Sequence, residues 1–296
     1  MLQFQQLQQI IIVSFLAAAA ISDLKKREVP NWVNYGLVVI GVSFGLLQSV
    51  IAADWHFLAF SIAGLFSALA LAALMFYTGQ WGGGDSKLLI GLGAVLGLPF
   101  AAASPFVDIG GPLPLLSFLV NLVVVSLFYA IAWGAVLAFR NKKRFGIELN
   151  RQLKSYSLFR RLLLALSAVS LVMVLAINDI VVRVGIISVL TTLFFGLYLS
   201  ILAKAVEKSC MLKQLNPLKL TEGDWIAKDI IISGKRICGP KDLGIEKSQI
   251  RQLVSLYRRK KVRTVLVKEG IPFAPSFLIA YLITVFFGNL LIAFVR

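Results

Sequence analysis

The chain has 296 residues, of which 58% are hydrophobic and 15% are charged, and its mean hydropathy is +0.85. This composition excludes an ordinary soluble globular protein and a disordered chain. The formal net charge of +16 is compatible with a nucleic-acid partner or with a membrane surface, so the positions of the basic residues decide between them.

Apolar segments recur along the whole chain. A membrane-spanning helix needs about 20 predominantly apolar residues, and we predict eight spans: Leu7–Ser22, Trp32–Ala52, Phe57–Tyr77, Lys87–Ala103, Leu115–Phe139, Leu162–Ile177, Ile180–Ala203 and Pro272–Val295. Small residues at Gly41-x-x-x-Gly45 and Gly93-x-x-x-Gly97 predict close packing between helices. The predicted fold class is an all-α polytopic membrane protein with about eight transmembrane helices and a small α+β cytoplasmic module.

The basic residues lie in loops that alternate spans place on one side of the membrane. Three occupy positions 25–27, eight occupy 140–161 and sixteen occupy 204–268, whereas the opposite loops carry aspartates and no lysine. The positive-inside bias therefore predicts a multi-pass protein of the cell membrane, with its amino terminus outside and its basic loops in the cytoplasm. We expect these loops to contact anionic membrane lipids. We expect no nucleic-acid partner, because no patch interleaves aromatic with basic residues.

This pattern divides the chain into four expected parts. They are a membrane core of spans one to five (1–139), a basic loop with spans six and seven (140–206), a cytoplasmic α+β module (207–270) and a final transmembrane helix (271–296). Within the module, Asp229–Cys238 reads as a β-hairpin, Gln249–Lys261 as a helix and Arg263–Val267 as a strand. A unit of this size has a marginal core of its own, so we expect it to rest on the membrane domain or on lipid.

Two aspartates lie at the predicted cytoplasmic face. Asp23 closes the first span in a stretch that continues to Pro30 and Asn31, and Asp85 opens the fourth span in Gly82-Gly83-Gly84-Asp85-Ser86-Lys87. Alone, each has an ordinary explanation. Asp23 could be a juxtamembrane charge, Asp85 an amino-terminal helix cap, and Lys87 a side chain that extends to lipid head groups.

Together they suggest a catalytic pair, because carboxylates at a bilayer boundary are costly to desolvate. Spans one and four meet the same membrane face, and side-by-side packing of these spans would bring the two carboxylates together. Two aspartates can hydrolyse a peptide bond when one is ionised, the other is protonated and a water lies between them. Helix dipoles favour charge on Asp85, at a helix start, and a proton on Asp23, at a helix end. The three glycines have no Cβ, so a substrate backbone could approach closely.

The conjunction of the two motifs resembles the GxGD membrane aspartic peptidases, specifically the prepilin and preflagellin (prearchaellin) peptidases. The resemblance is carried by Asp23-Leu-Lys-Lys-Arg-Glu-Val-Pro30-Asn31 and by Gly82-Gly83-Gly84-Asp85-Ser86-Lys87, and it covers about residues 10–100. It implies catalysis by Asp23 and Asp85, with Gly82 and Gly84 shaping the second motif. The chain looks more like the archaeal branch, because it lacks the amino-terminal insert with two C-x-x-C pairs of bacterial members.

The resemblance also implies a substrate. It would be a type IV pilin-like or archaellin precursor whose short basic leader precedes one hydrophobic helix, and no cofactor would be needed. No metal site is expected, because Cys210 and Cys238 form no C-x-x-C pair and His56 is the lone histidine. Two alternatives stay open: a non-catalytic membrane anchor that presents residues 207–270 to an assembly partner, and a transporter. Charges cluster at the ends of the spans rather than at the bilayer midplane, which disfavours the transporter.

Overall fold

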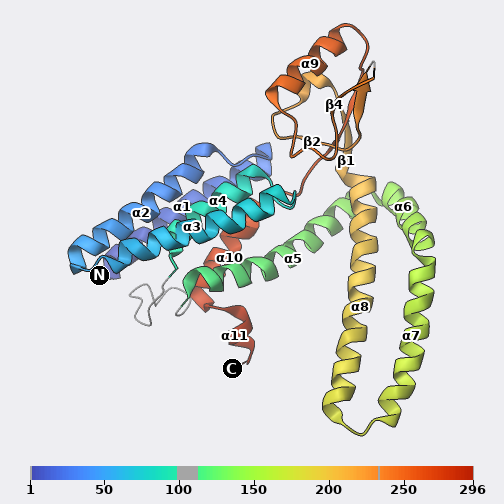
Figure 1. Ribbon diagram of the computed structural model, residues 1–296, viewed down its shortest axis with the longest axis horizontal. Coiled ribbons are helices and arrows are strands. Elements are labelled where there is room, and N and C mark those ends of the chain that lie inside the picture. Colours follow the sequence, from blue (N-terminus) through green and yellow to red (C-terminus); the bar gives the residue numbers. More distant parts are fainter. Residues whose placement is uncertain (1, 99–112, 233, 296) are drawn as a thin grey trace.

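The structure is a computed structural model that describes residues 2–98, 113–232 and 234–295. These parts of the chain are mainly helical (Figure 1). The membrane helices and their neighbours are α1 (Leu2–Lys26), α2 (Asn31–Ala52), α3 (His56–Tyr77), α4 (Gly83–Leu96), α5 (Pro114–Arg140), α6 (Lys142–Ser155), α7 (Ser157–Ala176), α8 (Ile180–Val206), α10 (Ala274–Phe287) and α11 (Leu290–Val295).

Within the described residues, six helices are long and apolar enough to cross a membrane: α1, α2, α3, α5, α7 and α8. They match six of the eight predicted spans, and the prediction of a helical, polytopic membrane protein is confirmed. The fourth predicted span begins as α4, which ends at Leu96; residues 99–112 lie outside the described part. The total of eight spans stays a prediction.

The last predicted span, Pro272–Val295, is not one continuous helix. It is divided into α10 and α11 at Gly288, where φ is +71°. The side chain of Asn121, on α5, is fully buried and hydrogen-bonds to backbone groups that have no helical partner at this break. Its amide nitrogen donates to the Gly288 carbonyl at 2.7 Å, and its oxygen accepts from the Leu290 N–H at 3.0 Å. A break at this depth is tolerated because another helix supplies the missing hydrogen bonds.

The tightest packing surrounds α4, which lies against α2 and α3. A Cβ on Gly93 would lie 2.3 Å from the Cβ of Ala68 and 2.4 Å from the carbonyl oxygen of Gly64, both on α3. A Cβ on Gly41 would lie 2.6 Å from the carbonyl carbon of Ala94. No side chain fits at such distances, so the backbones can approach this closely only through glycine. The predicted small-residue faces are confirmed.

The carboxyl-terminal helix α10 packs against α1 and α5 (Figure 1). Its buried side chains belong to the same apolar core as those of α1, α4 and α5; they are Ala274, Phe277, Ala280 and Tyr281. The core that holds Asp23 and Asp85 is therefore assembled from both ends of the described chain.

Helices α7 and α8 form a long hairpin that extends away from the helices α1–α5 (Figure 1). The carboxylate of Asp179 accepts hydrogen bonds from the N–H groups of Val181 and Val182, which caps the start of α8. The basic helix α6 packs against the far end of α8. Most apolar side chains of the hairpin are exposed, which is the pattern expected of helices surrounded by lipid.

The segment between α8 and α10 folds as a small α+β module. A π-helical turn (Glu207–Met211) continues α8, and β1 (Leu212–Leu215), β5 (Val265–Lys268) and β2 (Trp225–Ile226) form an antiparallel sheet in that order. Strands β3 (Ile230–Ile232) and β4 (Lys235–Cys238) form a hairpin, a 3-10 turn spans Pro217–Lys219, and α9 spans Lys247–Arg258. The predicted hairpin, helix and strand are confirmed, with ends shifted by a few residues.

Candidate active site

Asp23 lies in the last turn of α1 and is almost completely buried, with 7% of its surface exposed. Its Oδ2 accepts a 2.9 Å hydrogen bond from the backbone N–H of Ala274, the first residue of α10. The first N–H groups of a helix have no partner within the helix and carry partial positive charge. This contact therefore favours the ionised form of Asp23, while burial opposes it.

Arg27 fastens the end of α1 to the segment that precedes α10. Helix α1 ends where Arg27 adopts a left-handed backbone, with φ at +60°, and the Arg27 N–H donates to the Asp23 carbonyl at 2.9 Å. The Arg27 guanidinium donates to the carbonyl of Gly270 at 2.9 Å and lies 5.5 Å from the ring centroid of Trp133, on α5. The connection between β5 and α10 is thus attached to α1 at both Asp23 and Arg27.

Asp85 lies in the first turn of α4, next to the extended N-cap residue Gly82. It lies outside the six helices long enough to span a membrane. Burial raises the pKa of Asp85 to about 7, and the negative charge of Asp23 also raises it, while a backbone hydrogen bond with Gly82 opposes both effects. The two carboxylates, 62 positions apart in sequence, therefore lie within reach of each other's charge.

Two details differ from the sequence-based expectation. Helix α4 packs chiefly against α2 and α3, and α1 chiefly against α10, so the carboxylates approach at helix ends rather than through a long α1–α4 interface. The dipole argument placed the resting charge on Asp85. Burial and the charge of Asp23 act in the other direction and raise the pKa of Asp85, so which of the two carboxylates holds the proton stays a prediction.

The three glycines before Asp85 are not required by the packing. A Cβ on Gly82 would meet Oδ2 of Asp85 at 3.7 Å, one on Gly83 would meet Phe76 at 3.7 Å, and one on Gly84 would meet Val29 at 3.4 Å. These are ordinary van der Waals distances, and Gly82 has φ at −73°, which any residue adopts. A side chain could therefore be accommodated at each of the three positions, and packing alone does not explain the glycines.

Lys87 connects the two motifs directly. Its Nζ donates to Oδ1 of Asn31 at 3.0 Å and lies 5.9 Å from the ring centroid of Tyr35. Pro30, with φ at −61° and ψ at 139°, sets the chain direction into α2 and leaves Asn31 as the first helical residue. Extension of Lys87 toward lipid, the alternative raised by the sequence, is not its arrangement here.

Sequence reasoning missed two neighbours of Asp23. One is the Ala274 N–H of α10, which is 251 positions from Asp23 in the sequence and which no motif near Asp23 indicates. The other is Tyr129 on α5, whose hydroxyl is close enough to Asp23 and Arg27 for their charges to act on it, and which has no hydrogen-bond partner within the described chain. Its i,i+4 spacing from Trp133, whose ring stacks on it with the ring centroids 5.9 Å apart, was the available signal.

Among the described residues, no group of three or more histidines, cysteines or carboxylates could hold a metal ion.

Comparison with known proteins gives the same family as the motifs. Residues 10–139 match the type IV leader peptidase family. A preflagellin peptidase of Methanococcus maripaludis is 32% identical over 129 residues, which are 43% of this chain and 55% of that protein. A preflagellin peptidase of Methanocaldococcus jannaschii is 33% identical over 129 residues, which are 54% of its length. The chain thus spans about half the length of these curated relatives. Residues 10–139, which hold both aspartate motifs, are thus similar to the type IV leader peptidase family and to these preflagellin peptidases.

Proposed function

We propose that this protein is a membrane-embedded aspartic endopeptidase that removes the short basic leader of archaellin or type IV pilin-like precursors. The observation that supports it most is the placement of Asp23 and Asp85. The two carboxylates come from different motifs, Asp23 is buried and Asp85 partly buried, and the charge of Asp23 raises the pKa of Asp85. The names of the relatives add the precursor as the substrate class.

The two environments suit different roles in the reaction. The N–H of Ala274 stabilises charge on Asp23, and burial beside Asp23 raises the pKa of Asp85 to about 7, so that a large share of it stays protonated at neutral pH. In the proposed reaction, ionised Asp23 takes a proton from a water as the water oxygen attacks the scissile carbonyl carbon. Protonated Asp85 donates to the developing oxyanion. As the C–N bond breaks, Asp23 gives the proton it took from water to the leaving nitrogen, Asp85 recovers its proton as the carbonyl re-forms, and the amine and the carboxylic acid leave.

The proposed site lies at the cytoplasmic face, because the positive-inside bias places the loop after α1 there. A leader that precedes a hydrophobic helix would then reach the site from the cytoplasm while its helix stays in the membrane. Gly82 to Gly84 have no Cβ, so in the proposed complex the extended substrate backbone approaches Asp85 along this segment.

Co-expression with an archaellin precursor tests this proposal. Wild-type protein should convert the precursor to the shorter product, seen as a mobility shift, whereas Asp23→Asn and Asp85→Asn should each lower the rate by about four orders of magnitude. Asp179→Asn is the matched control, because asparagine caps a helix as well as aspartate does and this residue lies at the far end of the hairpin. Each variant is quantified in the membrane fraction. Normal processing by either of the first two variants would contradict the two-aspartate mechanism.

A further inference from the structure

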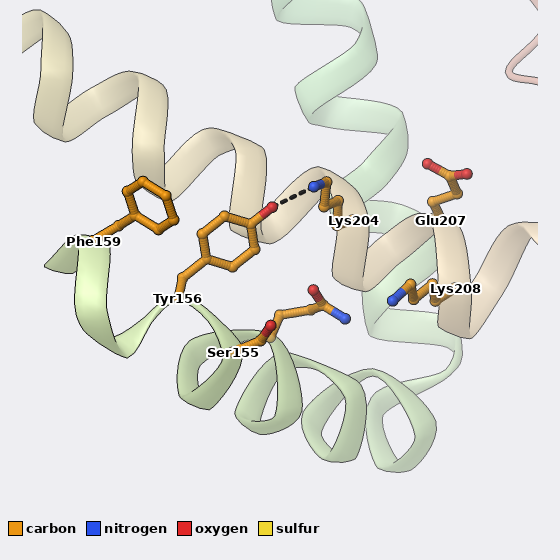
Figure 2. A pocket seen from close by; sticks show the side chains of 7 residues that line it. Ser155, Tyr156, Phe159, Lys204, Glu207 and Lys208 are labelled. Carbon is orange, nitrogen blue, oxygen red and sulfur yellow. Dashed lines mark hydrogen bonds between the residues drawn. The ribbon is translucent and has the colours of Figure 1, made fainter.

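A cavity of about 430 Å³ lies where α6, the start of α7 and the end of α8 meet. Figure 2 shows the side chains that line it, among them Tyr156, Phe159, Lys204, Glu207 and Lys208. This cavity lies outside residues 10–139, the part that matches the peptidase family. Nothing in the proposed peptide hydrolysis uses it.

The cavity presents a cation that no described carboxylate neutralises. The ammonium of Lys204 hydrogen-bonds to the hydroxyl of Tyr156 (Figure 2) and lies 5.0 Å from the centroid of that ring. Lys204 takes part in none of the ion pairs among the described residues. A tyrosine hydroxyl and an aromatic face stabilise an ammonium without cancelling its charge.

The carboxylates nearest to the cavity are engaged elsewhere or held loosely. Glu207 pairs with Lys268 at 2.9 Å. Glu148 lies 3.9 Å from Lys208, and it also accepts a 2.5 Å hydrogen bond from the amide of Gln152, a buried lining residue. Around the cavity, segments 140–161 and 204–208 carry ten basic and two acidic residues. The electrostatic potential in the cavity is therefore positive and attracts an anion.

Apolar surface continues from the rim of this cavity along the hairpin. Leu158, Phe159 and Leu162 on the first turns of α7 are 58–61% exposed, and none of the most apolar 18-residue stretch of α8 is buried inside the protein. A cationic, aromatic-lined hollow at the end of lipid-facing helices coincides with the depth at which head groups lie. A free phosphate would use the cations alone and gain nothing from the exposed apolar side chains.

We propose that this cavity binds the phosphate of an anionic phospholipid, with Lys204 and Tyr156 as the main contacts and the acyl chains lying along α7 and α8. Lys208 completes the positive rim. Phe159 separates the polar hollow from the acyl region. The lipid fills a groove between helices that have no protein partner on their outer faces within the described residues, so it also stabilises the hairpin against the rest of the protein.

Native mass spectrometry of the full-length detergent-solubilised protein tests the site. Wild-type protein is titrated with phosphatidylglycerol and, separately, with phosphatidylcholine. We expect preferential retention of phosphatidylglycerol, and a loss of affinity of about tenfold in Lys204→Met, which keeps the apolar stem and removes the charge. Tyr156→Phe should lose less, because the ring remains. Lys143→Met is the matched control, since it removes one charge from an exposed residue of α6 outside the cavity.

The arms of this experiment separate the possible outcomes. Equal losses in Lys204→Met and Lys143→Met would overturn the proposal in favour of diffuse attraction to the basic surface. Equal retention of the two lipids would exclude recognition of the anionic head group. Displacement of phosphatidylglycerol by 10-fold excess inorganic phosphate would identify a free-anion site instead. The thermal midpoint of each variant, measured without added lipid, shows whether a change in binding reflects unfolding. The outcome is independent of peptidase activity.

Discussion

The bundle around α4 and the hairpin of α7 and α8 are almost equally apolar, yet they pack in opposite ways. The apolar windows of α3 and α8 have mean hydropathies of 2.3 and 2.2, but 28% of the first window is buried inside the protein and none of the second. The difference lies in small residues. Glycines of α3 and α4 let backbones touch, whereas a Cβ on Gly185 or Gly196 of α8 would meet nothing within 4 Å. Hydropathy predicts that a helix enters the membrane, while small residues at contact positions decide whether protein or lipid covers it.

One substitution should have opposite effects in the two regions. Gly93→Ala places a Cβ 2.3 Å from the Ala68 side chain and 2.4 Å from a backbone oxygen, which should lower the free energy of unfolding by about 1–3 kcal/mol. Gly196→Ala meets no neighbour, and the gain in helix propensity should leave stability unchanged or higher by up to about 1 kcal/mol. Thermal midpoints in one detergent compare the two. Equal destabilisation would show that α8 is as tightly packed as α4.

Proton binding by Asp85, in the bundle, should make the rate of leader removal depend on pH. Asp85 has a pKa of about 7 in the folded protein, above its ordinary value of 3.8. The proposed mechanism needs the protonated form, so kcat/KM for leader removal should fall about tenfold per unit as pH rises above about 7. A profile measured from pH 5.5 to 9 checks this. A flat profile up to pH 9 would show that protonated Asp85 is not required.

Two arginines make the same kind of contact in the two regions. Arg27 donates to the Gly270 carbonyl beside Asp23, and Arg183 donates to the Ile177 carbonyl at the tip of the hairpin. Arg27→Gln should lower processing about three- to tenfold, because it releases one of the two attachments between α1 and the segment before α10. Arg183→Gln should leave processing unchanged. Similar losses in both would mean that the hairpin tip contributes to the reaction.

The smallest loss of processing is expected when the hydrogen bond between the two aspartate motifs of the bundle is removed. Lys87→Met and Asn31→Ala each remove the 3.0 Å hydrogen bond between Nζ and Oδ1, and each should lower processing about two- to threefold. The double variant should lose no more than either single variant, because the residues act as one pair. Additive losses measured in the same processing assay would show that Lys87 and Asn31 act separately.

The motifs could be read from the sequence because their information is local. Asp23 ends an apolar span and Asp85 starts one, and short runs around each carry the family resemblance. The pairing of Lys87 with Asn31 could not be read, because no periodicity connects positions 56 apart. The charge state of Asp85 depends on two kinds of effect: a helix dipole is visible in a sequence, whereas the burial that opposes it depends on several helices at once.

The fold also combines features that local sequence predicts with features that depend on contacts between distant residues. Length and hydropathy predicted six of the spans, but a break at Gly288 requires knowledge of Asn121, which is 167 positions away in the chain. The boundaries at 139 and 271 stay predictions. In space, α10 packs with α1 and α5.

The hydrogen bond from Ala274 to Asp23 has a consequence for how this molecule can be dissected. A gene fragment ending at residue 139 would encode both acids and every residue of the family match, yet it would leave the first acid without its donor from the opposite end of the polypeptide. Because only residues 269–273 separate β5 from that donor helix, a mechanical pull on the small domain would reach the acid through a short stretch of backbone.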